Sequence, residues 1–271
     1  MTSVVRQWRE HGEPPQPASR WSRDPWLKLF PGHHAFLDAL PDGIDRAEAT
    51  RHAERAVTPE GAELAFLVAM IWGYGRVGYG AWRTARVLAE NPHAVERLAE
   101  VALVARDHGG RAAFRNLADE PLRYLGVAFG TKYLRFVTTA QSPDHASAPI
   151  LDAVVRRWLA THADLRLNIN EWRPDVYEQY VDLLTSWSTK LDLATDTVEE
   201  LIFRSAISQD GSAQWAERWA GSDEPATPTG KAQATLLELE RLFDTADAGP
   251  AEEARPHLDE LAQIIQRGWA D

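Results

Sequence analysis

Apolar residues recur at helical spacing along most of this chain, and this period is the feature that most constrains its fold. The stretch TPEGAELAFLVAMIW begins at Thr58, and its residues Leu64, Leu67, Val68 and Ile71 fall three or four positions apart. Thr followed by Pro is typical of a helix start, because threonine caps free amide groups and proline is tolerated at the first helical position. We therefore expect a core helix that begins near Thr58.

Further periodic segments follow, separated by Gly, Pro, Asn or Asp. No segment alternates apolar and polar residues convincingly, so we predict an all-α fold. Residues 1–30 are rich in Pro, Trp and Arg without a helical period, and we interpret them as an extended arm that packs through Trp21, Trp26, Leu27 and Phe30. The expected later helices cover residues 81–90, 92–106, 110–118, 120–125, 131–139, 149–161, 174–191, 195–208 and 212–220.

Composition divides the chain into three parts. Residues 1–57 are the N-terminal arm and packing segment, and residues 58–220 are the helical body. The stretch AGSDEPATPTG at 220–230 is small, polar and proline-containing, as linkers are. Residues 221–271 are therefore expected to be a linker and a C-terminal helical hairpin, a helical appendage that packs on the body or binds a protein partner. Its two helices are expected at about 231–244 and 251–268.

The composition also excludes several kinds of site. The chain has no cysteine, which rules out disulfides, thiolate zinc sites and cysteine-held iron–sulfur clusters. Its nine histidines show no metal-binding spacing, so we expect no metal and no cofactor. No stretch approaches the roughly 18 apolar residues that a membrane span needs, and the N-terminus lacks an apolar signal core. We expect a cytoplasmic, nucleoid-associated monomer without membrane contact.

The net charge of −11 argues against a nucleic-acid partner, because phosphate contacts dominate that kind of affinity. The charge is unevenly distributed, however. Residues 70–160 carry twelve basic and eight acidic side chains, a net charge of +4, so the rest of the chain carries −15. The middle of the chain could face a polyanion while the flanks keep binding weak. A coding bias toward arginine would explain the same split.

A glycine-rich corner with one lysine stands out in the stretch GVAFGTKYLRF, which begins at Gly126. We expect a short helix to end there, a tight turn to reach Gly130 and a new helix to start near Thr131. Glycines let the backbone approach a phosphate, and free amide groups at a helix start donate to it. Arg123 and Arg135 could flank the phosphate path. The pattern also fits an ordinary helical corner.

The stretch SAPILDAVVRRWLA follows about 20 residues after that lysine. We expect Pro149 to open a helix, with Asp152 in its first turn among apolar residues. The helix dipole favours an acidic residue there, yet a carboxylate among apolar neighbours is costly to bury unless it has a partner or a task. Lys132 and Asp152, each near a helix start, can converge on one cleft.

This lysine-then-aspartate arrangement resembles the helix-hairpin-helix DNA glycosylases, most closely a compact bacterial form of the 8-oxoguanine DNA glycosylase branch, over roughly residues 58–210. GVAFGTK is similar to that branch's hairpin and its catalytic lysine, here Lys132. PILDAVVRRW is similar to the segment with its essential aspartate, here Asp152. EELIFRSAI is similar to a late helix that binds the extruded base, which would place Phe203 on the base face and Glu199 at its edge.

The chain departs from the branch at several positions. Ala128 and Phe129 are inserted relative to the usual G-V-G-x-K hairpin, and Val154 stands where the branch often has a histidine. Glu199 replaces a neutral amide, and the eukaryotic enzymes' N-terminal sheet domain has no counterpart. Cluster-bearing relatives such as endonuclease III need four cysteines, and the alkyl-base glycosylases lack an equivalent of Lys132.

The resemblance implies a DNA glycosylase with AP-lyase activity that extrudes a modified, 8-oxoguanine-like purine from double-stranded DNA. The amine of Lys132 would attack C1′ of the sugar and form a Schiff base, and an ionised Asp152 would stabilise positive charge on the sugar. The stretch WGYGRVGYGAWR would hold the gap open. The expected DNA contacts are Tyr74, Arg76 and Tyr79 from this stretch, with Gly126, Gly130, Thr131, Arg123 and Arg135 from the hairpin.

Two other interpretations fit the same sequence. One is a DNA-binding or defence-associated helix-hairpin-helix module that has lost catalysis. The other is an all-helical protein-interaction domain that uses its eleven tryptophans for core and partner surfaces. Covalent trapping with borohydride separates the enzyme from the first, and salt-dependent DNA binding excludes the second.

Overall fold

The computed structural model describes residues 1–141, 147–207, 258 and 261. These residues are mostly helical, which confirms the all-α prediction, with one short antiparallel sheet. The expected helix at 212–220 lies outside the described residues, as do the linker and nearly all of the C-terminal hairpin. None of the described helices is long and apolar enough to cross a lipid bilayer. The elements are α1 (Thr2–Glu10), β1 (Ser19–Arg20), α2 (Arg23–Leu29), the 3-10 helix η1 (Pro31–His33), α3 (His34–Ala39), β2 (Gly43–Ile44), α4 (Arg46–His52), α5 (Pro59–Tyr74), α6 (Tyr79–Ala89), α7 (Ala94–Asp119), α8 (Val127–Gln141), α9 (Ala153–His162), α10 (Pro174–Leu191) and α11 (Thr195–Ile207).

Helix α5 lies at the centre of the core and packs against α7 and α8. It begins as predicted, because the hydroxyl of Thr58 accepts a hydrogen bond from the helix backbone and Pro59 takes the first position. The predicted apolar face is buried, and Leu67, Val68 and Ile71 have no exposed surface. A helix that is apolar on most sides must be covered on most sides, so the other helices of the core pack around α5.

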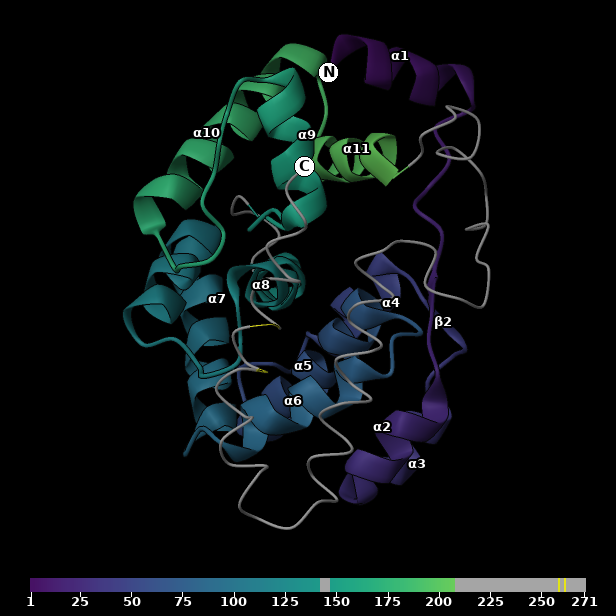
Figure 1. Ribbon diagram of the computed structural model, residues 1–271, viewed down its shortest axis with the longest axis vertical. Helices are drawn as coiled ribbons and strands as arrows, with labels where there is room; N and C mark the ends of the chain where they lie inside the picture. Colours follow the sequence, from purple (N-terminus) through teal and green to yellow (C-terminus); the bar gives the residue numbers. More distant parts are fainter. Residues whose placement is uncertain (142–146, 208–257, 259–260, 262–271) are drawn as a thin grey trace.

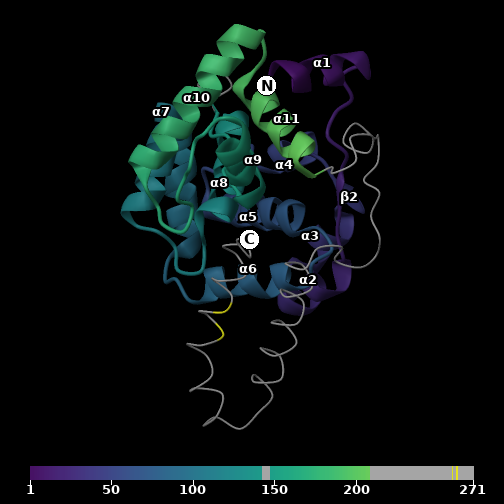
Figure 2. The ribbon, with the colours of Figure 1, turned by 45° about the horizontal axis from the view of Figure 1, so that its top comes forward.

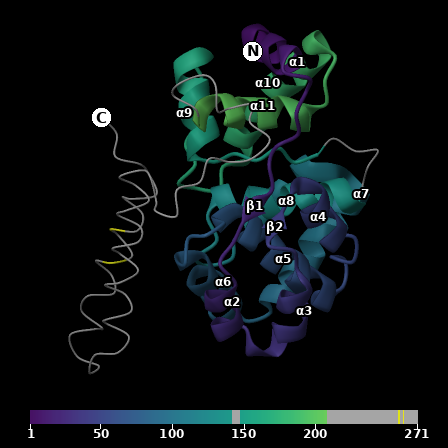
Figure 3. The same cartoon turned by 90° about the vertical axis from the view of Figure 1, so that its right-hand side faces the viewer.

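The helices gather in two groups (Figure 1). Figure 3 shows α1, α9, α10 and α11 at one end of the molecule and α2 to α8 at the other. Figure 2 shows α10 alongside α7, a contact that joins the two groups. The chain passes between the groups after α1 and again between α8 and α9. Residues far apart in sequence therefore meet where the groups face each other.

The N-terminal residues are not the extended arm that we expected, because they contain α1, β1 and α2. Helix α1 buries Val5 against Leu201 of α11. Val4 and Val5 lie four and three positions before Trp8, and all three face this contact, so α1 has a helical period that our interpretation of residues 1–30 missed. Trp21, Trp26 and Phe30 are buried in the core, as predicted.

The range of α7 contains two helical segments that meet at a kink, which agrees with the expected pair at 92–106 and 110–118. Gly109 separates them, because its φ of +78° and ψ of −177° are not helical. A β-carbon on Gly110 would lie 2.6 Å from the backbone of Ala148, so this glycine permits a close approach. The expected helix at 120–125 is wrong, because the chain from α7 to α8 is not helical.

Candidate active site

A cleft of about 990 Å³ lies between the two groups of helices. Its wall includes Lys132, Asp152, Glu199 and Phe203, so all four residues predicted for catalysis and base binding share one cleft. Within the described part of the chain, no cluster of acidic and histidine side chains is arranged to hold a metal ion. Other lining residues are Gln16, Arg46, Trp72, Gly73, Tyr74, Arg83, Arg123, Tyr124, Gly126, Phe129, Val154 and Trp172.

Lys132 lies on α8, which begins earlier than predicted. The helix starts at Val127, and the amide of Gly130 donates a hydrogen bond to the carbonyl of Gly126 at 2.9 Å. The expected tight turn is therefore the first turn of the helix. The residues inserted into the hairpin, Phe129 among them, extend α8 at its N-terminus. Of the predicted hairpin contacts, Gly126 remains exposed at the cleft.

The amine of Lys132 is held by three neighbours. Its Nζ donates to Oδ2 of Asp152 at 3.2 Å and to the carbonyl of Ala128 at 3.3 Å, and it lies 4.9 Å from the centre of the Phe129 ring. Only 7% of the residue is exposed. The structure therefore brings the predicted lysine and aspartate into direct contact at the cleft.

Asp152 is the N-cap of α9 and not a residue of its first turn, because the helix begins at Ala153 and not at Pro149. Its Oδ1 accepts hydrogen bonds from two backbone amides of α9, both at 3.0 Å, while Oδ2 faces Lys132. These three hydrogen bonds offset the cost of burying the carboxylate. The same side chain thus starts a helix and pairs with the amine.

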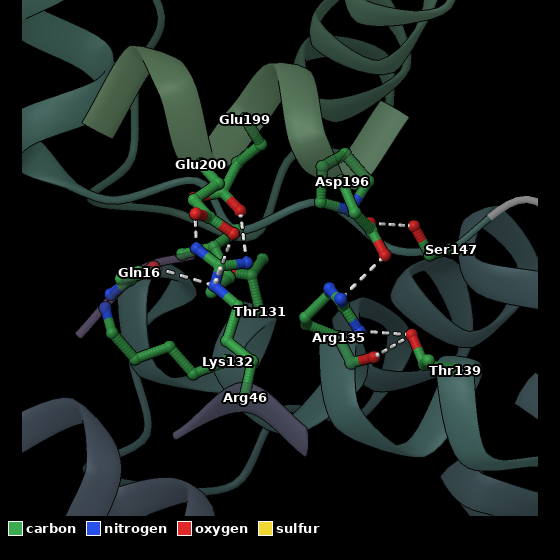
Figure 4. Close-up of polar contacts among 12 residues, drawn as sticks. Gln16, Arg46, Thr131, Lys132, Arg135, Thr139, Ser147, Asp196, Glu199 and Glu200 are labelled. Carbon is green, nitrogen blue, oxygen red and sulfur yellow. Dashed lines mark hydrogen bonds and ion pairs between the residues drawn. The ribbon is translucent and has the colours of Figure 1, made fainter. Parts of the chain in front are cut away.

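Three residues that we expected to contact DNA are buried around α8. Thr131 has no exposed surface, and its hydroxyl accepts a hydrogen bond from the backbone just before α9. A β-carbon on Gly130 would lie 2.3 Å from the ring of Trp172. Arg135 is 7% exposed and pairs with Asp196 at 2.8 Å, as Figure 4 shows. None of these three residues lines the cleft, and their contacts with DNA stay a prediction.

The loop between α5 and α6 carries the remaining expected contacts. Tyr74 lines the cleft and stacks on Phe129, with ring centres 3.8 Å apart. Arg76 is exposed. Tyr79 is 5% exposed, and its hydroxyl accepts a hydrogen bond from Arg83 at 3.1 Å. Tyr74 therefore faces the cleft, whereas Arg76 is not among the cleft's lining residues, and the burial of Tyr79 does not fit a residue that holds the gap in DNA open.

Gly73 shapes the path of the lysine side chain, although the sequence pattern did not mark it individually. A β-carbon there would lie 2.7 Å from Cδ of Lys132 and 3.0 Å from the ring of Phe129. Only glycine leaves room for both side chains at the end of α5. Its place in a glycine-rich stretch beside the cleft was the available signal.

Three arginines surround the ring of Tyr124 at the cleft. The guanidinium carbons of Arg83, Arg86 and Arg123 lie 5.0, 3.9 and 5.2 Å from the ring centre. Glu90 pairs with two of them, at 3.1 and 3.7 Å, so the cluster keeps a net positive charge. Only Arg123 was predicted. Such a cluster favours DNA phosphates.

Glu199 lines the cleft but is held in a buried ion pair. Its oxygens accept hydrogen bonds from Arg46 at 2.7 and 3.3 Å, and Nε of Arg46 donates to Gln16 at 2.8 Å. Figure 4 shows Arg46 between Gln16 and the glutamates of α11. Burial raises the pKa of the Glu199 carboxyl, against the opposing charge of Arg46. Phe203 lies one turn later on α11 and is half-buried.

Arg46 and Gln16 were not predicted, and no local pattern marks them. Arg46 and Glu199 are separated by 153 positions in the chain. The contact forms only because α4, in the group α2 to α8, lies close to α11 in the other group of helices. A single sequence carries no signal for such a pair.

Comparison with known proteins identifies one family. Residues 12–203 match the model of the family described as "Putative 8-oxoguanine DNA glycosylase OGG-like protein". No curated protein and no solved structure matches the chain. The matched range includes Lys132 and Asp152, and it also includes Gln16, Arg46 and Glu199.

Proposed function

Because the chain belongs to the OGG-like family of 8-oxoguanine DNA glycosylases, we propose that it excises a modified purine such as 8-oxoguanine from double-stranded DNA and then cleaves the strand. The family supports a DNA glycosylase kind of function with DNA as substrate. The observation that carries the finer proposal is the contact of 3.2 Å between Lys132 and Asp152 inside the cleft.

Lys132 is the proposed nucleophile. Its amine must lose a proton before it can attack C1′ of an extruded nucleotide. The attack forms a bond between Nζ and C1′ and breaks the bond between C1′ and the base. The departing base takes the electron pair and then a proton. The lone pair of Nζ then forms a double bond to C1′ as the bond between C1′ and the ring oxygen O4′ breaks, and O4′ takes a proton. The Schiff base acidifies C2′, and loss of a proton there eliminates the 3′ phosphate, which accounts for strand cleavage.

Asp152 is the proposed electrostatic partner. Its Oδ1 is fixed by the amides at the start of α9, so Oδ2 is held facing Lys132 without further ordering. A carboxylate fixed in this way stabilises the positive charge that develops on the sugar as the base leaves. The same group orients the amine before attack.

The rest of the cleft provides contacts for DNA. The cluster of Arg83, Arg86 and Arg123 around Tyr124 supplies positive charge for the phosphate backbone. Phe203 offers an apolar ring at the cleft against which an extruded base can stack. These features favour an enzyme that holds an extruded nucleotide.

The proposal is tested with duplexes that carry 8-oxoguanine, other oxidised purines or an unmodified guanine at one position. We expect release of the modified purine, strand cleavage, and a protein–DNA complex that borohydride makes permanent. A protein that binds these duplexes in a salt-dependent way but forms no such complex would instead be a DNA-binding module without catalysis. Absence of DNA binding would exclude both.

A further inference from the structure

We propose that Arg46, and not Glu199, reads the edge of the extruded base, and that it selects a base with a carbonyl oxygen at position 6. This inference rests on the proposed function. The family resemblance places Glu199 at the base edge, but the Glu199 side chain has no exposed surface, whereas 12% of the Arg46 side chain is exposed. Both residues line the cleft, so Arg46 is the member of the pair that a base can reach.

Arg46 keeps hydrogen-bond donors for a ligand. A guanidinium has five N–H groups and no acceptor. One N–H points to Gln16 and two point to the carboxylate of Glu199. Glu200 lies 3.8 Å from Nε, beyond hydrogen-bond distance. No other hydrogen bond joins the guanidinium of Arg46 to a described residue, so two of its N–H groups remain.

Two other neighbours of Arg46, Gln16 and Trp72, supply further donors. Gln16 uses its amide oxygen to accept from Arg46, which leaves its amide nitrogen as the group that it can offer. The indole N–H of Trp72, whose ring centre is 5.3 Å from the guanidinium carbon of Arg46, is buried without a hydrogen-bond partner. This part of the cleft therefore favours a ligand that supplies acceptors.

The chemistry of the purine edge then decides the substrate class. A purine attached through C1′ near Lys132 presents the far edge of its six-membered ring away from the sugar. In a 6-oxopurine this edge carries a carbonyl oxygen, which accepts from Arg46. In a 6-aminopurine the ring nitrogen N1 can accept from one N–H group, but the amino group beside it would face a side chain that can only donate.

Glu199 acts through Arg46 and is a positioning residue. A carboxylate that accepts from both terminal nitrogens fixes the plane and rotation of the guanidinium. The two free N–H groups of Arg46 are then aimed before a base enters. This arrangement explains why the more buried of the two charged groups is the carboxylate.

The experiment compares excision of 8-oxohypoxanthine and 8-oxoadenine from otherwise identical duplexes, since these bases differ only in the groups at position 6 and the adjoining ring nitrogen. Cleavage of an abasic duplex by the same preparations gives the internal reference. We expect the unmodified protein to prefer 8-oxohypoxanthine. Arg46→Gln should lower that preference by about tenfold or more, because an amide can both donate and accept. Arg51→Gln, an exposed arginine on the same helix α4, is the matched control and should keep the preference.

A second variant separates the loss of base selection from a loss of folding stability. Arg46→Gln leaves the buried Glu199 without its cation, whereas Arg46→Gln combined with Glu199→Gln removes both charges and should show the same loss of preference. Retention of the preference in both variants would overturn the proposal. A larger loss in Glu199→Gln alone than in Arg46→Gln would also overturn it.

Failure of this inference is distinct from failure of the proposed function. If the unmodified protein releases neither base and leaves abasic DNA intact, the proposed function is wrong. If it cleaves abasic DNA and excises both bases equally, the proposed function stands and the role of Arg46 is refuted.

Discussion

The two buried ion pairs of the cleft differ in what holds them together. Lys132 and Asp152 are 20 positions apart and belong to consecutive helices, Lys132 in the second turn of α8 and Asp152 at the N-cap of α9. Arg46 and Glu199 are 153 positions apart and join α4 to α11 across the two groups of helices. The first pair joins two helices that are neighbours in sequence, whereas the second forms only when α4 and α11, from opposite ends of the chain, pack together.

The two pairs also differ in geometry. Nζ of Lys132 makes a single contact with Asp152, and both side chains keep about a tenth of their surface exposed. Arg46 makes two contacts with Glu199, which has no exposed surface. We therefore expect the first pair to control the rate of reaction and the second to control folding stability and the choice of base.

The largest predicted effect on stability belongs to the second pair. Glu199→Ala should lower the free energy of unfolding by about 3–5 kcal/mol, because it leaves the Arg46 charge buried and unpaired. Urea denaturation measures this loss. Asp182→Ala on α10, which removes an exposed ion pair with Arg111 at 2.5 Å, should cost much less. Equal losses would show that the second pair has no special role in stability.

Asp152→Asn should break the first pair without unfolding the protein. Asparagine caps helices about as well as aspartate, so α9 should keep its start, while loss of the negative charge should lower the excision rate by about 100-fold to 1000-fold. Single-turnover kinetics and DNA affinity separate the two effects. Asp45→Asn, the equivalent change at the N-cap of α4, is the control and should retain the excision rate. An Asp152→Asn protein as fast as its parent would contradict the assignment.

Gly73→Ala should disturb the lysine itself. The added methyl group would displace the side chain of Lys132, and a shift of about 1 Å can cost up to 100-fold in rate. We expect a loss of about tenfold to 100-fold in cleavage of abasic DNA. Gly78→Ala in the neighbouring loop has no atom within 4 Å of the added group and should retain activity. If both variants lose activity equally, loop flexibility and not lysine placement is responsible.

The smallest predicted effect concerns stacking at the base face. Phe203→Ala should reduce the preference for 8-oxoguanine over normal guanine by about tenfold, because stacking of a base on an aromatic ring contributes about 1–3 kcal/mol. Competition between the two duplexes measures the preference. Unchanged discrimination would remove Phe203 from the base site.

The sequence predicts what depends on local pattern. Helix α10 has the bounds that its period and Pro174 indicated, and the start of α5 follows from Thr58 and Pro59. The contact of Lys132 with Asp152 also came from two stretches that each mark a helix start.

What remained hidden depends on burial and on long-range contacts. Arg135 has the composition of a surface residue, but α8 is enclosed on most sides and its arginine pairs inside the protein with Asp196. Helix α1 has a short apolar stripe of Val4, Val5 and Trp8 that packs on α11, and it is too short to stand out among the prolines and arginines of residues 1–30. The role of Arg46 depends on its contact with α11, which is distant in sequence and which no local pattern indicates.

The central claim is that Lys132 forms the covalent bond to DNA, and peptide mapping of the borohydride-reduced complex tests it most directly. The chain has four lysines and one N-terminal amine, so the site of attachment is unambiguous. We predict that the DNA remnant lies on Lys132, and that Lys132→Gln binds DNA normally but forms no complex. Attachment to another amine, or a trapped complex with Lys132→Gln, would contradict the proposed mechanism.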